Sequence, residues 1–119
     1  MCGIAGEFGH RASSPQARSV RTERALARIR HRGPDQFGVY ADPYTALGNA
    51  RLSIVDLASG QQPISNEDDT LWIVFNGEIF NHVELRPGLE ARGHRFKTRA
   101  DTEVILHLYE DYGPDCLQH

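Results

Sequence analysis

The spacing of apolar residues predicts two kinds of element in the first half of the chain. From about Gln16 to Arg30, the apolar residues Val20, Leu26 and Ile29 share one stripe of a helix, and we expect the arginines of this segment on its solvated outer face. Short apolar runs separated by glycine, proline or aspartate are typical of strands. These expected strands are residues 2–8, residues 37–41 and residues 45–50, the last two joined by a turn at Asp42-Pro43.

The pattern of apolar residues is less regular in the second half of the chain. Residues 70–76, TLWIVFN, form the most apolar run of the chain, so we expect a strand that is buried on both faces. Residues 83–92 have helical composition, but Pro87-Gly88 should shorten or kink that helix. A final helix is expected from Asp101 to Tyr112. Two further strands are predicted at residues 51–57 and 94–98.

The order of these elements predicts an α+β fold. Adjacent short strands favour stacked antiparallel sheets with helices outside, rather than a doubly wound parallel sheet. The 119 residues correspond to one domain. No apolar run is long enough to cross a bilayer, and no secretory signal is apparent, so we expect a cytoplasmic protein that does not engage membranes.

Charge argues against a nucleic-acid-binding protein. The formal net charge is −3, with 16 acidic and 13 basic residues, whereas nucleic-acid binding needs a basic excess. Arginines do gather between Arg18 and Arg32, but aromatic residues for base stacking are missing among them.

The two cysteines, Cys2 and Cys116, are too few for a disulfide scaffold and lack the spacing of a zinc site. Removal of Met1 would give Cys2 a free α-amine. Cysteine thiols in general titrate at about 8.5 and α-amines at about 7.7–8.0, so one residue would hold both a nucleophile and a general base. The alternative is a small apolar residue that only begins a strand.

Five sequence blocks decide between these alternatives. They are MCGIAGEF at residues 1–8, HRGPDQFG at 31–38, ARLSIVDL at 50–57, FNGEIFNH at 75–82 and DTEVI at 101–105. Together, in this order and spacing, they resemble the class II glutamine amidotransferases, whose glutaminase domains belong to the N-terminal-nucleophile type. RGPD at 32–35 and RLSIVD at 51–56 resemble the asparagine synthetase branch in particular.

The resemblance implies a role for each matching residue. Cys2 would attack the side-chain amide of glutamine, and Asn76 and Gly77 would donate hydrogen bonds to the oxyanion. Arg51 would bind the substrate α-carboxylate, while Glu78 and Asp101 would accept from its α-ammonium group. The resemblance also implies a pocket lined by the backbone of Leu52, Ser53, Ile54 and Val55.

Some residues are not assigned to catalysis. We interpret His31 and Arg32 as part of a structural or gating loop, because the α-amine already provides the base. The other histidines show no ligand spacing along the sequence, so no metal is predicted for this chain.

The chain also departs from the family. Arg99-Ala100 precedes Asp101 where small or polar residues are common, and Pro87-Gly88 interrupts a helix that is usually continuous. Residues 1–119 therefore correspond, by resemblance, to the N-terminal part of a glutaminase domain, apparently truncated. By the same resemblance, we expect the synthetase domain, which would use ATP and magnesium, to lie outside residues 1–119, and we expect no cofactor in these residues themselves.

Two functions follow as hypotheses. The first is hydrolysis of glutamine to glutamate and ammonia by Cys2, with the ammonia supplied to a synthetase domain or subunit; aspartate or another carboxylate is the acceptor. The alternative is a catalytically idle module that binds glutamine or docks to a synthetase partner. An incomplete sandwich would have open sheet edges, so we also expect self-association, with a homodimer as one form.

Overall fold

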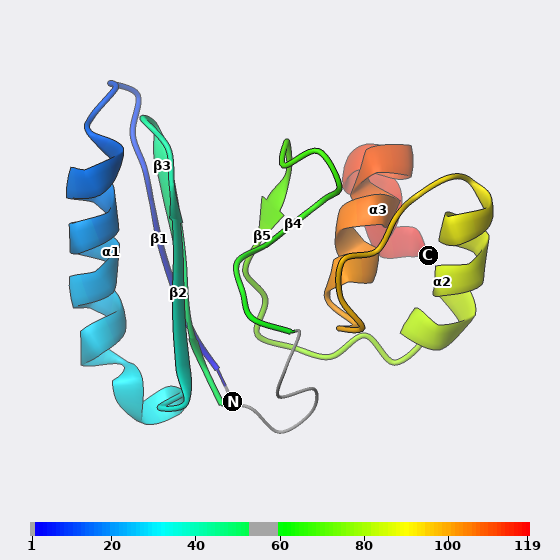
Figure 1. Ribbon diagram of the computed structural model, residues 1–119, viewed down its shortest axis with the longest axis horizontal. Coiled ribbons are helices and arrows are strands. Elements are labelled where there is room, and N and C mark those ends of the chain that lie inside the picture. Colours follow the sequence, from blue (N-terminus) through cyan, green and yellow to red (C-terminus); the bar gives the residue numbers. More distant parts are fainter. Residues whose placement is uncertain (1, 53–59) are drawn as a thin grey trace.

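The computed structural model describes residues 2–52 and 60–119 and forms successive layers. Helix α1 (Pro15–Arg28) covers one face of a three-stranded sheet, and the elements from residue 64 onward lie on the other side of that sheet (Figure 1). The α+β class with antiparallel sheets and flanking helices is confirmed. The predicted truncation remains a prediction.

The first sheet has the order β1-β3-β2 and is antiparallel throughout. Its strands are β1 (Gly3–Phe8), β2 (Gln36–Ala41) and β3 (Thr45–Arg51), close to the predicted limits. In the register, Gly3 lies opposite Ala50 and Gln36 lies opposite Arg51. The central strand β3 therefore ends beside the start of both its neighbours.

Small residues on β3 let α1 approach closely. A Cβ at Gly48 would lie 2.7 Å from Cγ2 of Thr22 and 2.8 Å from Cδ1 of Leu26. Ala46 and Ala50 share this face of the strand and are buried. The alternate residue Asn49 therefore faces the opposite layer.

The predicted solvated face of arginines is wrong at one position. Arg18 is only 5% exposed. Its guanidinium lies 2.6 Å from Oε1 of Glu7 on β1 and also donates to the carbonyl of Pro43. Arg18 lies on the sheet-facing stripe with Thr22 and Leu26, so a fully satisfied guanidinium takes a position where an apolar residue would be expected.

The second sheet is much smaller than predicted. It is a pair of two-residue strands, β4 (Ile64–Ser65) and β5 (Trp72–Ile73). The expected strand at residues 70–76 is therefore wrong in length, and its residues are half-buried or exposed rather than buried on both faces. Polar side chains hold this segment instead: Asn66 Oδ1 accepts from the backbone N–H groups of Thr70 and Leu71.

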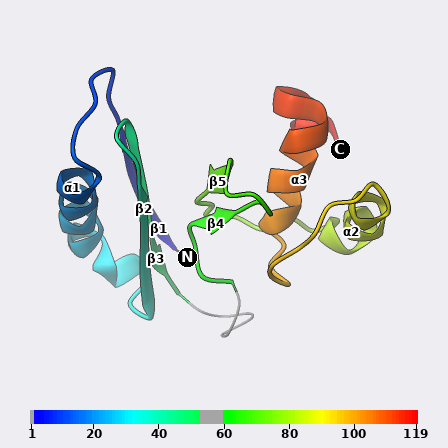
Figure 2. The same ribbon diagram turned by 45° about the horizontal axis from the view of Figure 1, so that its top comes forward.

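Helical segments follow β5, and Figure 2 labels two of them, α2 and α3. Helix α2 (His82–Ala91) is continuous through Pro87, so the predicted shortening at that proline is wrong. The predicted strand at residues 94–98 is also wrong, because this segment has no ladder partner among the described residues. The other two segments are α3 (Glu103–Tyr112) and a 3₁₀ turn, η2 (Gly113–Gln118).

Helices α2 and α3 share a compact apolar core. Leu89, Val104, Leu108 and Cys116 are buried together there, and Leu85 and Phe96 pack against them. Across residues 2–52 and 60–119, none of the helices has the length and apolar character needed to span a membrane.

Candidate active site

The predicted nucleophile lies beside the predicted oxyanion donor. The backbone nitrogen of Cys2 donates to Oδ1 of Asn76 at 3.1 Å, although the two residues are 74 positions apart in the sequence. Cys2 is partly buried and its thiol is free. This contact joins the start of β1 to the segment that follows β5.

The amide of Asn76 has a defined orientation. Because Oδ1 accepts from the nitrogen of Cys2, the Nδ2 group at the other end of the same amide faces away from that nitrogen. Among the described residues, Nδ2 makes no hydrogen bond. It is therefore open to donate a hydrogen bond to a ligand oxygen.

The space beside Gly77 is occupied by the side chain of the residue two positions earlier. The ring of Phe75 fills the space where a side chain would start, because a Cβ at Gly77 would lie 2.4 Å from Cζ of that ring. The segment is not the end of a rigid strand, as the sequence suggested, since β5 stops at Ile73.

Gln62 holds this segment in place, and the sequence analysis missed it. Its side chain is buried and reaches three segments. Oε1 accepts from the backbone nitrogen of Phe75 at 2.6 Å and from Nδ2 of Asn49 at 3.2 Å, and Nε2 faces Oγ1 of Thr102 at 3.5 Å. A glutamine in a polar loop carries no distinctive signal, so only the fold reveals this role.

Asp101 contacts the chain segment that carries Asn76. Its Oδ2 accepts from the backbone nitrogen of Ile79 at 2.7 Å, which places its carboxylate next to the chain that carries Asn76 to Glu78. Glu78 is exposed, and its carboxylate has no hydrogen bond or ion pair with a described residue. The two acids predicted to accept from an α-ammonium group therefore differ: Asp101 is partly engaged and Glu78 is open.

Arg51 is the last residue of β3 and lies at the same end of the sheet as Cys2. Since Gly3 pairs with Ala50, Arg51 is the residue opposite Cys2 when the register is extended by one position. Arg51 is largely buried, and its Nη1 donates to Oε1 of Gln36 at 3.2 Å.

The loop at residues 31–35 packs against both strand ends. A Cβ at Gly33 would lie 2.1 Å from the carbonyl oxygen of Ala50, so only glycine allows this close approach. The backbone nitrogen of Asp35 donates to the carbonyl of Arg51, and Nε of Arg32 donates to the carbonyl of Cys2 at 3.3 Å. The loop thus contacts the residue expected to be the nucleophile.

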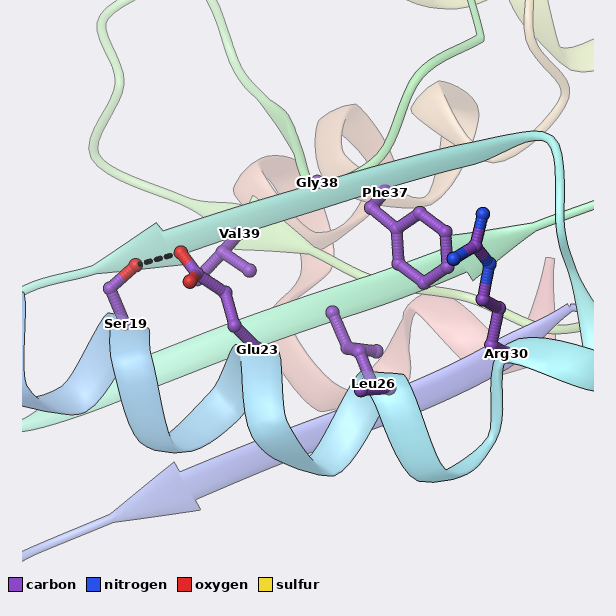
Figure 3. Close-up of a pocket in the computed structure, with 8 residues that line it drawn as sticks. Ser19, Glu23, Leu26, Arg30, Phe37, Gly38 and Val39 are labelled. Atoms are coloured by element: carbon purple, nitrogen blue, oxygen red, sulfur yellow. Dashed lines mark hydrogen bonds between the residues drawn. The ribbon is translucent and has the colours of Figure 1, made fainter.

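The predicted lining of the pocket is only partly described. Leu52 is half-buried beside Arg51, whereas Ser53, Ile54 and Val55 lie outside the described residues. A separate hollow of about 460 Å³ lies between α1 and β2, floored by Leu26 and Phe37, with Arg30 over the phenyl ring (Figure 3). None of the predicted site residues lines it, so it is distinct from the Cys2 site.

Comparison with known sequences establishes the family of the chain. The glutamine amidotransferase domain family matches residues 1–119, and the chain belongs to that family. It is 49% identical over 115 residues to asparagine synthetase [glutamine-hydrolyzing] 1 of Arabidopsis thaliana, covering 97% of this chain and 19% of that protein. It is 45% identical over 116 residues to asparagine synthetase [glutamine-hydrolyzing] 1 of Bacillus subtilis (strain 168), covering 94% of this chain and 18% of that protein.

A third relative shows the same relation. Asparagine synthetase [glutamine-hydrolyzing] of Sandersonia aurantiaca is 50% identical over 115 residues, which cover 95% of this chain and 21% of that protein. The chain thus spans about one-fifth of the length of these relatives. The predicted resemblance to the asparagine synthetase branch is confirmed.

Proposed function

We propose that this chain hydrolyses glutamine to glutamate and ammonia, with Cys2 as the nucleophile. The observation that carries the proposal is the contact between Cys2 and Asn76, which brings together the two groups that amide hydrolysis needs. The proposal requires that Met1 is removed, because only then does Cys2 have a free α-amine.

The chemistry proceeds in two stages. The α-amine takes the thiol proton, and the sulfur forms a bond to the side-chain amide carbon of glutamine. The tetrahedral intermediate then expels ammonia, which takes up the proton, and leaves a thioester. Water attacks the thioester, releasing glutamate and restoring the thiol.

Asn76 and Gly77 are suited to stabilise the oxyanion. The Nδ2 group of Asn76 and the backbone N–H of Gly77 follow each other along one segment, and Gln62 and Phe75 fix that segment. Donors that are held in place before the reaction stabilise developing charge without reorganisation.

The charged residues around this pair match the ends of glutamine. Arg51 is suited to its α-carboxylate, because a planar guanidinium can bind a carboxylate through two hydrogen bonds. Glu78 and Asp101 are suited to its α-ammonium group. Leu52, Ser53, Ile54 and Val55 remain the proposed pocket lining.

The ammonia would serve amide formation elsewhere. The relatives are named as glutamine-hydrolysing asparagine synthetases, so we propose that a synthetase domain or subunit, working in the cytoplasm with ATP and magnesium, uses the ammonia. We assign no residue of this chain to ATP or magnesium, and the acceptor is aspartate or another carboxylate.

The test compares the two cysteines. Cys2→Ala and Cys2→Ser should abolish release of ammonia from glutamine, while Cys116→Ala, in the α2–α3 core, should retain it if the protein stays folded. Full turnover in Cys2→Ala would refute the proposal. Glutamine binding without turnover in protein that lacks Met1 would instead identify the idle binding module.

A further inference from the structure

A second cluster of reactive side chains lies away from Cys2. Glu67 follows β4, His94 follows α2, and His107 and Glu110 lie one turn apart on α3. One ligand atom from each of these four residues lies within 4.8 Å of all the others. Figure 1 shows α3 between the β4–β5 pair and α2, which is how three distant segments supply one cluster.

The separations fit a tetrahedral ion. Nδ1 of His107 lies 2.8 Å from Oε2 of Glu110 and 3.3 Å from Oε2 of Glu67. Nδ1 of His94 lies 3.3 Å from Oε2 of Glu110 and 3.7 Å from Oε1 of Glu67. Tetrahedral zinc with bonds of about 2.0–2.1 Å places its ligand atoms about 3.3–3.4 Å apart, so the four ligand atoms, which spread over as much as 4.8 Å, would move closer together around the ion.

The outer nitrogens of both histidines face carboxylates. Nε2 of His94 lies 2.9 Å from Oδ1 of Asp111, and Nε2 of His107 lies 3.7 Å from Oε1 of the fully buried Glu103. A carboxylate behind the imidazole is the usual support for a metal-bound histidine, because it fixes the tautomer and the ring orientation. His94 has this support, whereas Nε2 of His107 makes no hydrogen bond with a described residue. Nδ1 of His107 nevertheless lies close to the Oε2 atoms of both glutamates.

The two glutamates are oriented in a similar way. Oε1 of Glu110 accepts from Nδ2 of Asn66 at 2.9 Å, and Oε1 of Glu67 accepts from the backbone nitrogen of Arg95 at 3.2 Å. This leaves the Oε2 atoms for the centre. Oε2 of Glu67 is buried and, within the described part of the chain, makes no hydrogen bond. Nδ1 of His107 lies 3.3 Å from it, and a metal ion between the two atoms would satisfy both.

We propose that Glu67, His94, His107 and Glu110 bind a divalent transition metal, with Zn²⁺ the best match. Two imidazoles and two carboxylates suit zinc, whereas magnesium and calcium prefer oxygen ligands alone. Four protein ligands make a closed, structural site that ties the segments after β4 and after α2 to α3. The sequence predicted no metal because the spacing 67, 94, 107, 110 follows no recognised ligand motif; the site exists only in the fold.

The proposal is tested by zinc binding to chelator-stripped protein carrying Cys2→Ser, which removes a competing thiol. Equilibrium dialysis should give about one zinc ion per chain, and zinc should raise the melting temperature. The double variant Glu67→Gln/His94→Gln should weaken binding by at least about 100-fold, since loss of supporting residues alone costs about 10–100-fold. The matched control His82→Gln/Glu84→Gln, on α2 outside the cluster, should bind like the parent.

Two further measurements cover a variant that fails to fold. Asp111→Asn keeps all four proposed ligands, weakens the carboxylate support of His94 together with the ion pair to Arg92, and should lower zinc affinity by about 10–100-fold. Cobalt bound in place of zinc should show the visible bands of a tetrahedral site without thiolate charge transfer. Folded protein that binds no zinc at about 10 μM, or that binds it equally in the double variant, would overturn the proposal and identify an ion-pair network. None of these readouts depends on glutamine hydrolysis.

Discussion

Different interactions stabilise the two halves of the molecule. In residues 2–51, a regular antiparallel ladder and small residues under α1 define the structure. In residues 60–119, the ladder is reduced to two residue pairs, and buried polar side chains such as Gln62, Asn66 and Glu103 hold the chain. The first half carries the proposed nucleophile, Cys2, and the second carries the proposed oxyanion donors, Asn76 and Gly77, so the proposed site depends on both kinds of order.

The largest expected effect is on the stability of residues 60–119, the half that buried polar side chains hold. Glu103 is fully buried and accepts from the backbone nitrogens of Lys97 and Thr98. Glu103→Ala leaves these donors without a partner, so we expect the free energy of unfolding to fall by about 3–5 kcal/mol. Chemical denaturation measures it. Glu90→Ala, which removes an exposed partner of Arg86, should cost only about 0–1 kcal/mol. Equal losses in the two variants would show that the polar contacts do not hold this half.

The next largest effect is expected on the kinetic constants of glutamine hydrolysis. Asn76→Ala removes one oxyanion donor and should lower kcat by about 10²–10³-fold with little change in KM. Steady-state glutaminase kinetics measure both constants. Arg51→Lys provides the contrast, because it loses the paired hydrogen bonds to the substrate and should mainly raise KM. A raised KM alone in both variants would show that the role assigned to Asn76 is wrong.

A smaller effect tests how the halves are joined. Gln62→Leu removes the acceptor for the backbone nitrogen of Phe75, and we expect unfolding to become easier by about 1–3 kcal/mol. Because Asn76 follows Phe75, kcat should also fall more than stability alone explains. Gln61→Leu, at the exposed neighbouring residue, is the matched control. An unchanged kcat in folded Gln62→Leu would argue against a positioning role.

The smallest effect is in the first half and depends on pH. Hydrogen bonds from Arg21 and Arg18 lower the pKa of Glu7 from 4.5 to about 2. A carboxyl whose pKa is depressed by folding stabilises the protein above its unfolded pKa, so this contribution is complete above pH 4.5 and is lost as the pH falls toward 2. Glu7→Gln should therefore unfold more easily than the parent at neutral pH. The difference in free energy of unfolding should shrink across that acid range, and a constant difference would contradict the assignment.

The same contrast explains what the sequence could predict. The strands and the helix of the first half follow apolar periodicity and turn residues, so their positions were predicted closely. Residues 70–76 and 94–98 looked like strands because they are apolar or β-branched, but Asn66, Gln62 and Glu103 satisfy their backbone groups in place of neighbouring strands. Composition does not reveal such contacts between side chains and the backbone.

The candidate site shows the same limit. The motif blocks identified Cys2, Asn76, Gly77 and Asp101, and the structure brings the segments that carry them together. Gln62 and the cluster around His107 were missed because their partners are separated by tens of residues and share no spacing rule. The sequence predicts Arg18 on the solvated face because a row of arginines on a helix is usually exposed. Only the fold shows that Glu7 lies next to Arg18 and pairs with it.

The most direct test of the central claim is to map where an electrophilic glutamine analogue reacts. Peptide mass spectrometry of the labelled, intact protein reports both the modified residue and the state of the N-terminus. Cys2 and Cys116 are the free cysteines of the chain. We predict a single label on Cys2 in protein that has lost Met1, with glutamine protecting it. A label on Cys116 alone, or full glutaminase turnover in protein that retains Met1, would contradict the account.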